Sequence, residues 1–191
     1  MKVVGFNGSA RKGGNTAELI GRVFRELEAE GIATELIELS GKKMGGCIAC
    51  YKCFKNQNRR CAVTKDFMNE CIAAMDAADG IILASPTYFA NVTTEMKALM
   101  DRAGLVARAN NDMFARKVGA GVVAGRRGGS IQAFNALNAF FFIEQMIVPG
   151  SRYWNLGRGL EKGEVLEDKE GMETMEVLGR NMAWLMKKLA D

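Results

Sequence analysis

Four of the five cysteines in this 191-residue chain lie in one short stretch, "CIACYKCFKNQNRRC". They are Cys47, Cys50, Cys53 and Cys61, with the spacing C-x2-C-x2-C-x7-C. Thiolates at three-residue steps can wrap around one iron–sulfur cubane, and tandem ferredoxin ligands share the first two spacings. Structural zinc usually takes two cysteine pairs that a longer segment separates. The spacing therefore favours a [4Fe–4S] cluster, with free or reversibly oxidised thiols and a zinc site as the alternatives.

Positive charge surrounds these cysteines. Between Ser40 and Lys65 the chain has seven basic residues and no acidic one, although its formal net charge is only +4. The basic residues are Lys42, Lys43, Lys52, Lys55, Arg59, Arg60 and Lys65. They would stabilise an anionic cluster and raise its reduction potential, and they could steer an acidic electron carrier such as ferredoxin. Nucleic acid is not expected as a partner, because no recognised nucleic-acid module accompanies the charge.

The stretch "GSARKGGNT" (8–16) has the residue types of an anion-binding loop. It leads into a predicted helix, whose N-terminus offers free N–H groups and the positive end of the helix dipole. It lacks the Gly-Lys-Ser/Thr ending of a P-loop and the G-x-G-x-x-G of a dinucleotide site. We expect a phosphate site here, the alternative being a polar turn with a helix cap. The candidate ligands are Ser9, Arg11, Gly14, Asn15 and Thr16.

Two further loops follow predicted strands. "SPTYFANVT" (85–93) supplies aromatic surface and hydrogen-bonding groups that could flank a flat heteroaromatic ring, the alternative being the start of a helix with buried aromatics. "AGRRGGS" (124–130) supplies backbone donors and two arginines. Together with the phosphate loop they suit FMN better than an adenine nucleotide. The candidate residues are Pro86, Thr87, Tyr88, Phe89, Asn91, Gly125 and Arg126.

The elements that must position these loops alternate along the chain. Short β-branched or apolar runs predict strands at 2–9, 33–39, 80–85, 117–125 and 147–154. Helices are predicted at 16–30, 66–78, 93–104, 131–146 and 168–189. Five such alternations predict an α/β fold, a doubly wound parallel sheet with helices on both faces. Ligands of such sheets bind beyond the carboxyl ends of the strands, where all three loops lie.

The remaining features set the context. We expect a single domain over residues 1–191 with a functional insertion at about 40–65. Cys71 shares a predicted apolar helix stripe with Met68, Ile72 and Met75, which indicates a buried structural residue. No signal peptide and no membrane-spanning segment are expected, so a cytoplasmic location with reduced thiols is predicted.

The phosphate loop, the cysteine segment, "SPTYFANVTTEMKALMDR" and "NAFFFIEQMIVPGS" resemble the flavodoxin-like NAD(P)H-dependent FMN reductases. The resemblance is greatest to their iron–sulfur flavoprotein branch. It implies a five-stranded sheet of order 2-1-3-4-5 and non-covalent FMN. Its phosphate would lie at Ser9, Arg11, Asn15 and Thr16, and its ring against residues 85–91. It also implies a homodimer or homotetramer in which a neighbouring subunit completes the flavin site.

The leading hypothesis is an FMN-dependent oxidoreductase. It would pass electrons between NAD(P)H or ferredoxin, FMN and a [4Fe–4S] cluster to an acceptor such as flavin, quinone or dioxygen. Catalysis would reside in the flavin, because no side chain is a convincing general acid or base and the chain has no histidine. The alternatives are a cluster-free FMN or quinone reductase, a redox carrier or sensor without turnover, and a zinc-bearing interaction module.

Overall fold

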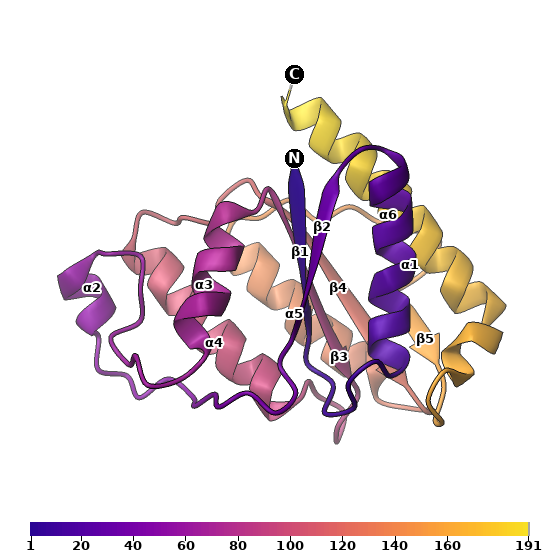
Figure 1. The fold of residues 1–191 in the computed structure, drawn as a ribbon, viewed down its shortest axis with the longest axis horizontal. Coiled ribbons are helices and arrows are strands. Elements are labelled where there is room, and N and C mark those ends of the chain that lie inside the picture. The colour runs from indigo at the N-terminus through magenta and orange to yellow at the C-terminus, as the bar shows by residue number, and fades with distance from the viewer. Residues whose placement is uncertain (191) are drawn as a thin grey trace.

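Five parallel strands form one sheet in the computed structural model, which describes residues 1–190 (Figure 1). The strands are β1 (Lys2–Asn7), β2 (Ala33–Glu38), β3 (Gly80–Pro86), β4 (Val118–Gly125) and β5 (Leu156–Arg158). Their order is β2-β1-β3-β4-β5, and every neighbouring pair is parallel. The predicted flavodoxin-like, doubly wound α/β sheet is confirmed.

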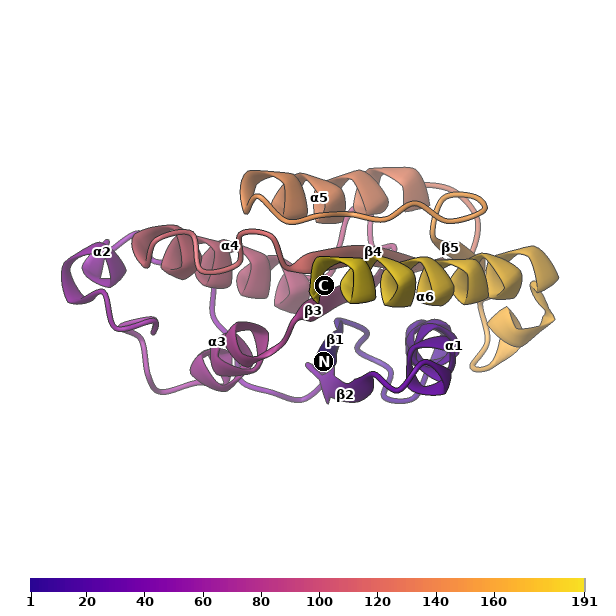
Figure 2. The same cartoon turned by 90° about the horizontal axis from the view of Figure 1, so that it is seen from above.

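Helices cover both faces of this sheet (Figure 2). The helices are α1 (Asn15–Ala29), α2 (Lys52–Asn56), α3 (Met68–Ala77), α4 (Thr94–Ala109), α5 (Ser130–Ile143), the 3-10 helix η1 (Glu164–Glu167) and α6 (Lys169–Ala190). Ile82 and Val122 pack with α1 and α6, whereas Ile81 and Leu83 face α3, α4 and α5. The central strands are therefore buried on both faces, as their continuous apolar sequences predict.

The predicted position of the fifth strand is wrong. Within 147–154 only Ile147 pairs with the sheet, through an isolated bridge to Val118. Pro149 has no N–H for a strand ladder, which explains why pairing does not continue. The chain rejoins β4 at Asn155, whose carbonyl accepts from Val123 N at 2.9 Å and whose side chain donates to Gly121 O at 3.0 Å. Strand β5 follows directly.

Helix α4 extends beyond its predicted end at Gly104. A Cβ at Gly104 would lie 3.0 Å from Glu144 Oε1 and 3.2 Å from Phe140 Cε2. The glycine therefore permits close packing of α4 against the C-terminal end of α5 and does not stop the helix. The additional turns carry Leu105 and Val106 toward the cysteine segment, which itself contains the short helix α2 that was not predicted. Within residues 1–190, no helix is long and apolar enough to cross a membrane.

The same contact buries an acidic side chain. Glu144 is 2% exposed, and its Oε2 has no hydrogen-bond partner within the described residues. Burial raises the pKa of this carboxyl from 4.5 to about 7, with Arg108 opposing the rise and Asp112 adding to it. The folded state therefore favours the protonated form of Glu144. The stability that this proton contributes is lost as the pH rises from the unfolded-state pKa through about 7.

We expect Glu144→Gln to remove this pH dependence. The variant should be more stable than the parent above pH 7 by about 2 kcal/mol, allowing for partial solvent screening of the charge, and should differ little at pH 5. Urea unfolding at pH 5, 6 and 8 measures this. Glu70→Gln, which removes an exposed carboxyl, is the control. A parent whose free energy of unfolding does not fall between pH 5 and 8 would contradict the assignment.

Candidate functional site

The loop between β1 and α1 is held from below by a carboxylate on β2. Glu38 Oε2 accepts from the Asn7 side-chain amide at 2.7 Å, and Glu38 Oε1 accepts from Gly13 N at 3.3 Å. Asn7 Oδ1 accepts from Ser9 N at 3.0 Å, and Ser9 Oγ accepts from Arg11 N at 3.1 Å. These bonds fix the loop without using the N–H groups at the start of α1.

The N-terminus of α1 has unsatisfied donors. Gly14 occupies the N-cap position and supplies no side-chain cap, and the N–H groups of Thr16 and Ala17 have no acceptor in the described part of the chain. Such a helix end attracts anions through its free N–H groups and its dipole. Gly13 has a φ of +60°, and a Cβ there would lie 3.6 Å from Lys162 Nζ. A cation from far along the chain thus lies over the predicted phosphate loop.

The segment after β5 closes this site. Asn15 Oδ1 accepts from Gly163 N at 2.8 Å and Val165 N at 3.4 Å, and Arg11 Nη1 donates to Leu160 O at 2.8 Å. Sequence reasoning missed this segment because it placed the fifth strand too early. Had the fifth strand been predicted at its true position, the loop that follows it would have been expected at the carboxyl edge of the sheet, beside the other predicted site loops.

One hollow of about 210 Å³ collects most of the predicted residues. It is lined by Ser9, Arg11, Asn15, Thr16, Pro86, Thr87, Tyr88, Ala124, Arg126, Gly159, Leu160 and Lys162. Three cations and no carboxylate are among these residues. The arrangement is suited to a multiply charged anion at the α1 end, with less polar surface at Pro86 and Ala124.

Four predicted residues do not line the hollow. Gly14 lies behind it as the helix cap, and Gly125 permits Ser130 to approach, since a Cβ there would overlap Ser130 Oγ. Asn91 pairs with Tyr88 through two backbone hydrogen bonds, of 2.9 and 3.0 Å, in a tight turn. Phe89, at the tip of that turn, is fully exposed with a φ of +47°. The alternative expectation of buried aromatics is therefore wrong for Phe89 and for the half-exposed Tyr88.

The four clustered cysteines line a second hollow, beside α4. It is formed by Cys47, Cys50, Cys53, Cys61, Ile48, Tyr51, Ala62, Val63, Arg102, Leu105 and Val106. Cys47 and Cys50 are exposed, Cys53 is buried on α2, and Cys61 is half-buried. Among residues 1–190, no three Cys, Asp or Glu side chains converge closely enough to hold a single metal ion. The thiols surround a space without meeting at one point.

Left-handed backbone shapes this hollow. Ala49, Tyr51, Gln57 and Arg59 have φ values of +50°, +51°, +44° and +58°. Each such non-glycine residue costs about 1–2 kcal/mol and persists only where the surrounding structure enforces it. Asn69 supplies part of that constraint, because its amide accepts from Cys61 N at 2.8 Å and donates to Cys61 O at 3.0 Å.

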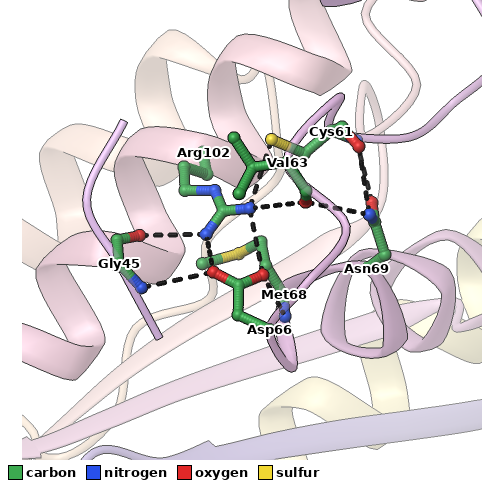
Figure 3. A network of polar contacts seen from close by, with 7 residues as sticks. All are labelled: Gly45, Cys61, Val63, Asp66, Met68, Asn69 and Arg102. Carbon is green, nitrogen blue, oxygen red and sulfur yellow. Dashed lines mark hydrogen bonds and ion pairs between the residues drawn. The ribbon is translucent and has the colours of Figure 1, made fainter. Parts of the chain in front are cut away.

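A buried arginine on α4 completes the network (Figure 3). The Arg102 guanidinium forms an ion pair with Asp66, donates to Gly45 O and Val63 O at 3.0 Å each, and donates to Cys61 Sγ at 3.3 Å. Burial alone would raise the pKa of the Asp66 carboxyl, but the hydrogen bonds from Arg102 and Gly45 and the charge of Arg102 outweigh it and lower that pKa.

The fifth cysteine is structural, as predicted. Cys71 is fully buried in the core, and burial raises the pKa of its thiol from 9.0 to about 12.

In metal-free, reduced protein at pH 8, we expect iodoacetamide to modify Cys47 and Cys50 readily and Cys71 about 1,000-fold more slowly, since only the thiolate reacts. Peptide mass spectrometry measures the rates, and alkylation in urea is the control. Equal rates in the folded protein would contradict this burial.

Comparison with known proteins agrees with this geometry. The family model of NADPH-dependent FMN reductases matches residues 1–161. An iron–sulfur flavoprotein from Methanocaldococcus jannaschii is 36% identical over 199 residues, covering 98% of each chain.

Two solved structures share the fold. A flavodoxin from the domain Archaea has a TM-score of 0.63 at 17% identity, with 98% of this chain and 99% of that one covered. RosB, with bound 8-demethyl-8-formylriboflavin-5'-phosphate, has a TM-score of 0.74 at 18% identity, with coverage of 100% and 80%. The chain is thus a flavin-dependent oxidoreductase that belongs to the NADPH-dependent FMN reductase family, in its iron–sulfur flavoprotein branch.

Proposed function

We propose that the carboxyl-edge hollow binds FMN and that the cysteine hollow holds a [4Fe–4S] cluster. The protein would transfer electrons between NAD(P)H or a reduced ferredoxin, these two groups, and an acceptor such as free flavin, a quinone or dioxygen. The observation that carries the proposal is the set of unsatisfied donors at the start of α1, which share one hollow with Arg11 and Lys162.

The phosphate of FMN suits the α1 end of the hollow. Thr16 N–H and Ala17 N–H have no other acceptor among the described residues, and the Ser9 and Thr16 side chains line the same hollow. Arg11 and Lys162 bring two positive charges to this hollow from loops that are about 150 residues apart in the sequence. Backbone donors, a helix dipole and cations together form a recurrent phosphate site.

The ring of FMN would extend beyond this hollow. A volume of about 210 Å³ is below the roughly 300 Å³ at which most ligand pockets begin. The turn 88–91 stands beside the hollow and exposes both of its aromatic side chains. The small hollow and the exposed turn support a homodimer or homotetramer. In such an assembly a second copy of the chain would cover this turn and complete the ring site.

The spread of the cysteine thiols favours a cluster over a single ion, and the hollow of about 20 Å³ would have to widen to admit a cluster. Ligands of one zinc ion must all reach it at about 2.3 Å, whereas the thiolates of a cubane bind different irons and stand further apart. The four cysteines line one hollow, no three of them converge on one point in the described residues, and one cation, Arg102, lines the hollow with them. Bound there, the cluster would supply single-electron transfer, and the cysteines would be its ligands.

The protein supplies no acid–base group at the flavin site. The lining side chains with ionisable groups are arginine, lysine and tyrosine, and the carboxyl with a pKa of about 7, Glu144, lies at the far end of α5. The roles left to the chain are to bind the flavin, orient it and set its electrostatic environment. A redox carrier without turnover would use the same site, so turnover must be measured.

Arg11→Gln and Lys162→Gln should each weaken FMN binding about 10- to 100-fold, because a charge-assisted hydrogen bond is worth about 1.5–3 kcal/mol. Riboflavin, which lacks the phosphate, should bind to the parent and to both variants with equal affinity. Fluorescence quenching of either flavin measures the dissociation constants. Lys12→Gln, in the same loop but outside the hollow, is the control. Equal losses for FMN and riboflavin would place the phosphate elsewhere.

Protein purified and reconstituted without oxygen should contain one FMN and about four irons with matching sulfide per chain, and should oxidise NAD(P)H or reduced ferredoxin steadily. Serine at Cys47 or Cys61 should abolish iron binding and leave FMN in place. Zinc without iron would favour the interaction module, and flavin reduction without steady turnover would favour a carrier. A chain that takes up no FMN would refute the proposal.

A further inference from the structure

The Arg102 side chain is the most deeply buried charge near the cysteines. It is 2% exposed, and its two terminal nitrogens donate to three residues of the cysteine segment. These are Gly45, which precedes the first clustered cysteine, and Cys61 and Val63, which lie at the C-terminal end of the segment. Its counterion, Asp66, lies on the same segment. Figure 3 shows the guanidinium between these partners.

One hydrogen bond of Arg102 is not part of its ion pair with Asp66. Arg102 Nη2 donates to Cys61 Sγ at 3.3 Å, and Cys61 is the only one of the four clustered cysteines whose sulfur accepts from a side chain of the described residues. Arg102 Nε, moreover, is buried with no acceptor among those residues. A buried N–H without an acceptor costs about 1–3 kcal/mol, and an acceptor in the hollow that Arg102 lines would remove that cost.

We propose that Arg102 is a positioning residue that fixes the Cys61 thiolate for the cluster and raises the reduction potential of the cluster, with Asp66 as the opposing charge. The inference rests on the proposed cluster. Reduction adds negative charge, so hydrogen bonds to a ligand sulfur and a nearby cation favour the reduced state. The Asp66 carboxylate opposes this effect of the cation. Removal of the two groups should therefore shift the potential in opposite directions.

The test uses the full chain, reconstituted anaerobically with iron, sulfide and FMN. Electron paramagnetic resonance at controlled potentials gives the midpoint potential of the cluster. Arg102→Gln should lower it and Asp66→Asn should raise it. Arg108→Gln, which removes an exposed cation from the same helix, should leave it unchanged. A purely structural role would not produce shifts of opposite sign.

Iron release to a chelator separates position from charge. Arg102→Lys keeps the cation but loses the planar fork, so the potential of this variant should fall less than that of Arg102→Gln, while iron leaves about 10- to 100-fold faster, the range for lost outer-sphere hydrogen bonds. Asn69→Ala should also accelerate release, because it frees the Cys61 backbone, without changing the potential.

The outcomes are distinct. A parent that holds FMN but assembles no cluster overturns both the cluster and this inference. A loaded cluster with unchanged potentials in Arg102→Gln and Asp66→Asn, or with shifts of the same sign, overturns this inference alone. If Arg102→Gln does not fold, Asp66→Asn and Arg102→Lys decide, since a raised potential in the first and faster iron loss in the second are both required.

Discussion

The buried ion pair between Arg102 and Asp66 is the interaction that holds the cysteine segment on the sheet domain. Burial of two charges is favourable only when both also find hydrogen bonds. Here the carboxylate also accepts from Gly45 N at 3.3 Å and Met68 N at 3.4 Å, while the guanidinium donates to two backbone carbonyls. The pair thus closes the segment into a loop whose two ends meet on α4.

The same helix also contacts the carboxyl edge of the sheet. Thr93, its N-cap, accepts from Met96 N at 3.3 Å and donates to Gly8 O at 2.8 Å, which ties α4 to the loop between β1 and α1. Arg102 lies nine residues further along, about 14 Å on the helix axis. One buried helix therefore fixes the spacing between the two hollows, and movement of α4 would disturb both.

Cations line both hollows, but they are held differently in each. At the carboxyl edge Arg11 and Lys162 come from loops and are exposed, so a ligand that arrives from solvent can reach them. Beside the cysteines Arg102 is buried and is held by several partners of this chain. The first arrangement leaves its cations in contact with solvent, and the second fixes its cation in a rigid surrounding.

Local sequence determined most of the fold. The alternation of apolar strands and amphipathic helices, and the glycine-rich start of α1, depend on neighbours within a few residues, so the pattern alone predicts them. It also placed four cysteines in one segment and named most of the residues that line the carboxyl-edge hollow. The sequence pattern misplaced β5, because pairing there depends on the hydrogen bond from Asn155 to β4. It also predicted that α4 ends at Gly104, a glycine that instead permits close contact with Glu144.

Only the tertiary structure decided which distant groups complete each site. Lys162 reaches the phosphate loop, and Arg102 reaches Cys61, across long stretches of chain. Nothing near either residue in the sequence signals this, because their partners are brought together by the packing of helices and loops on the sheet. Residue types and spacing therefore indicated which chemistry to expect, and long-range packing decided which distant side chains lie beside each hollow.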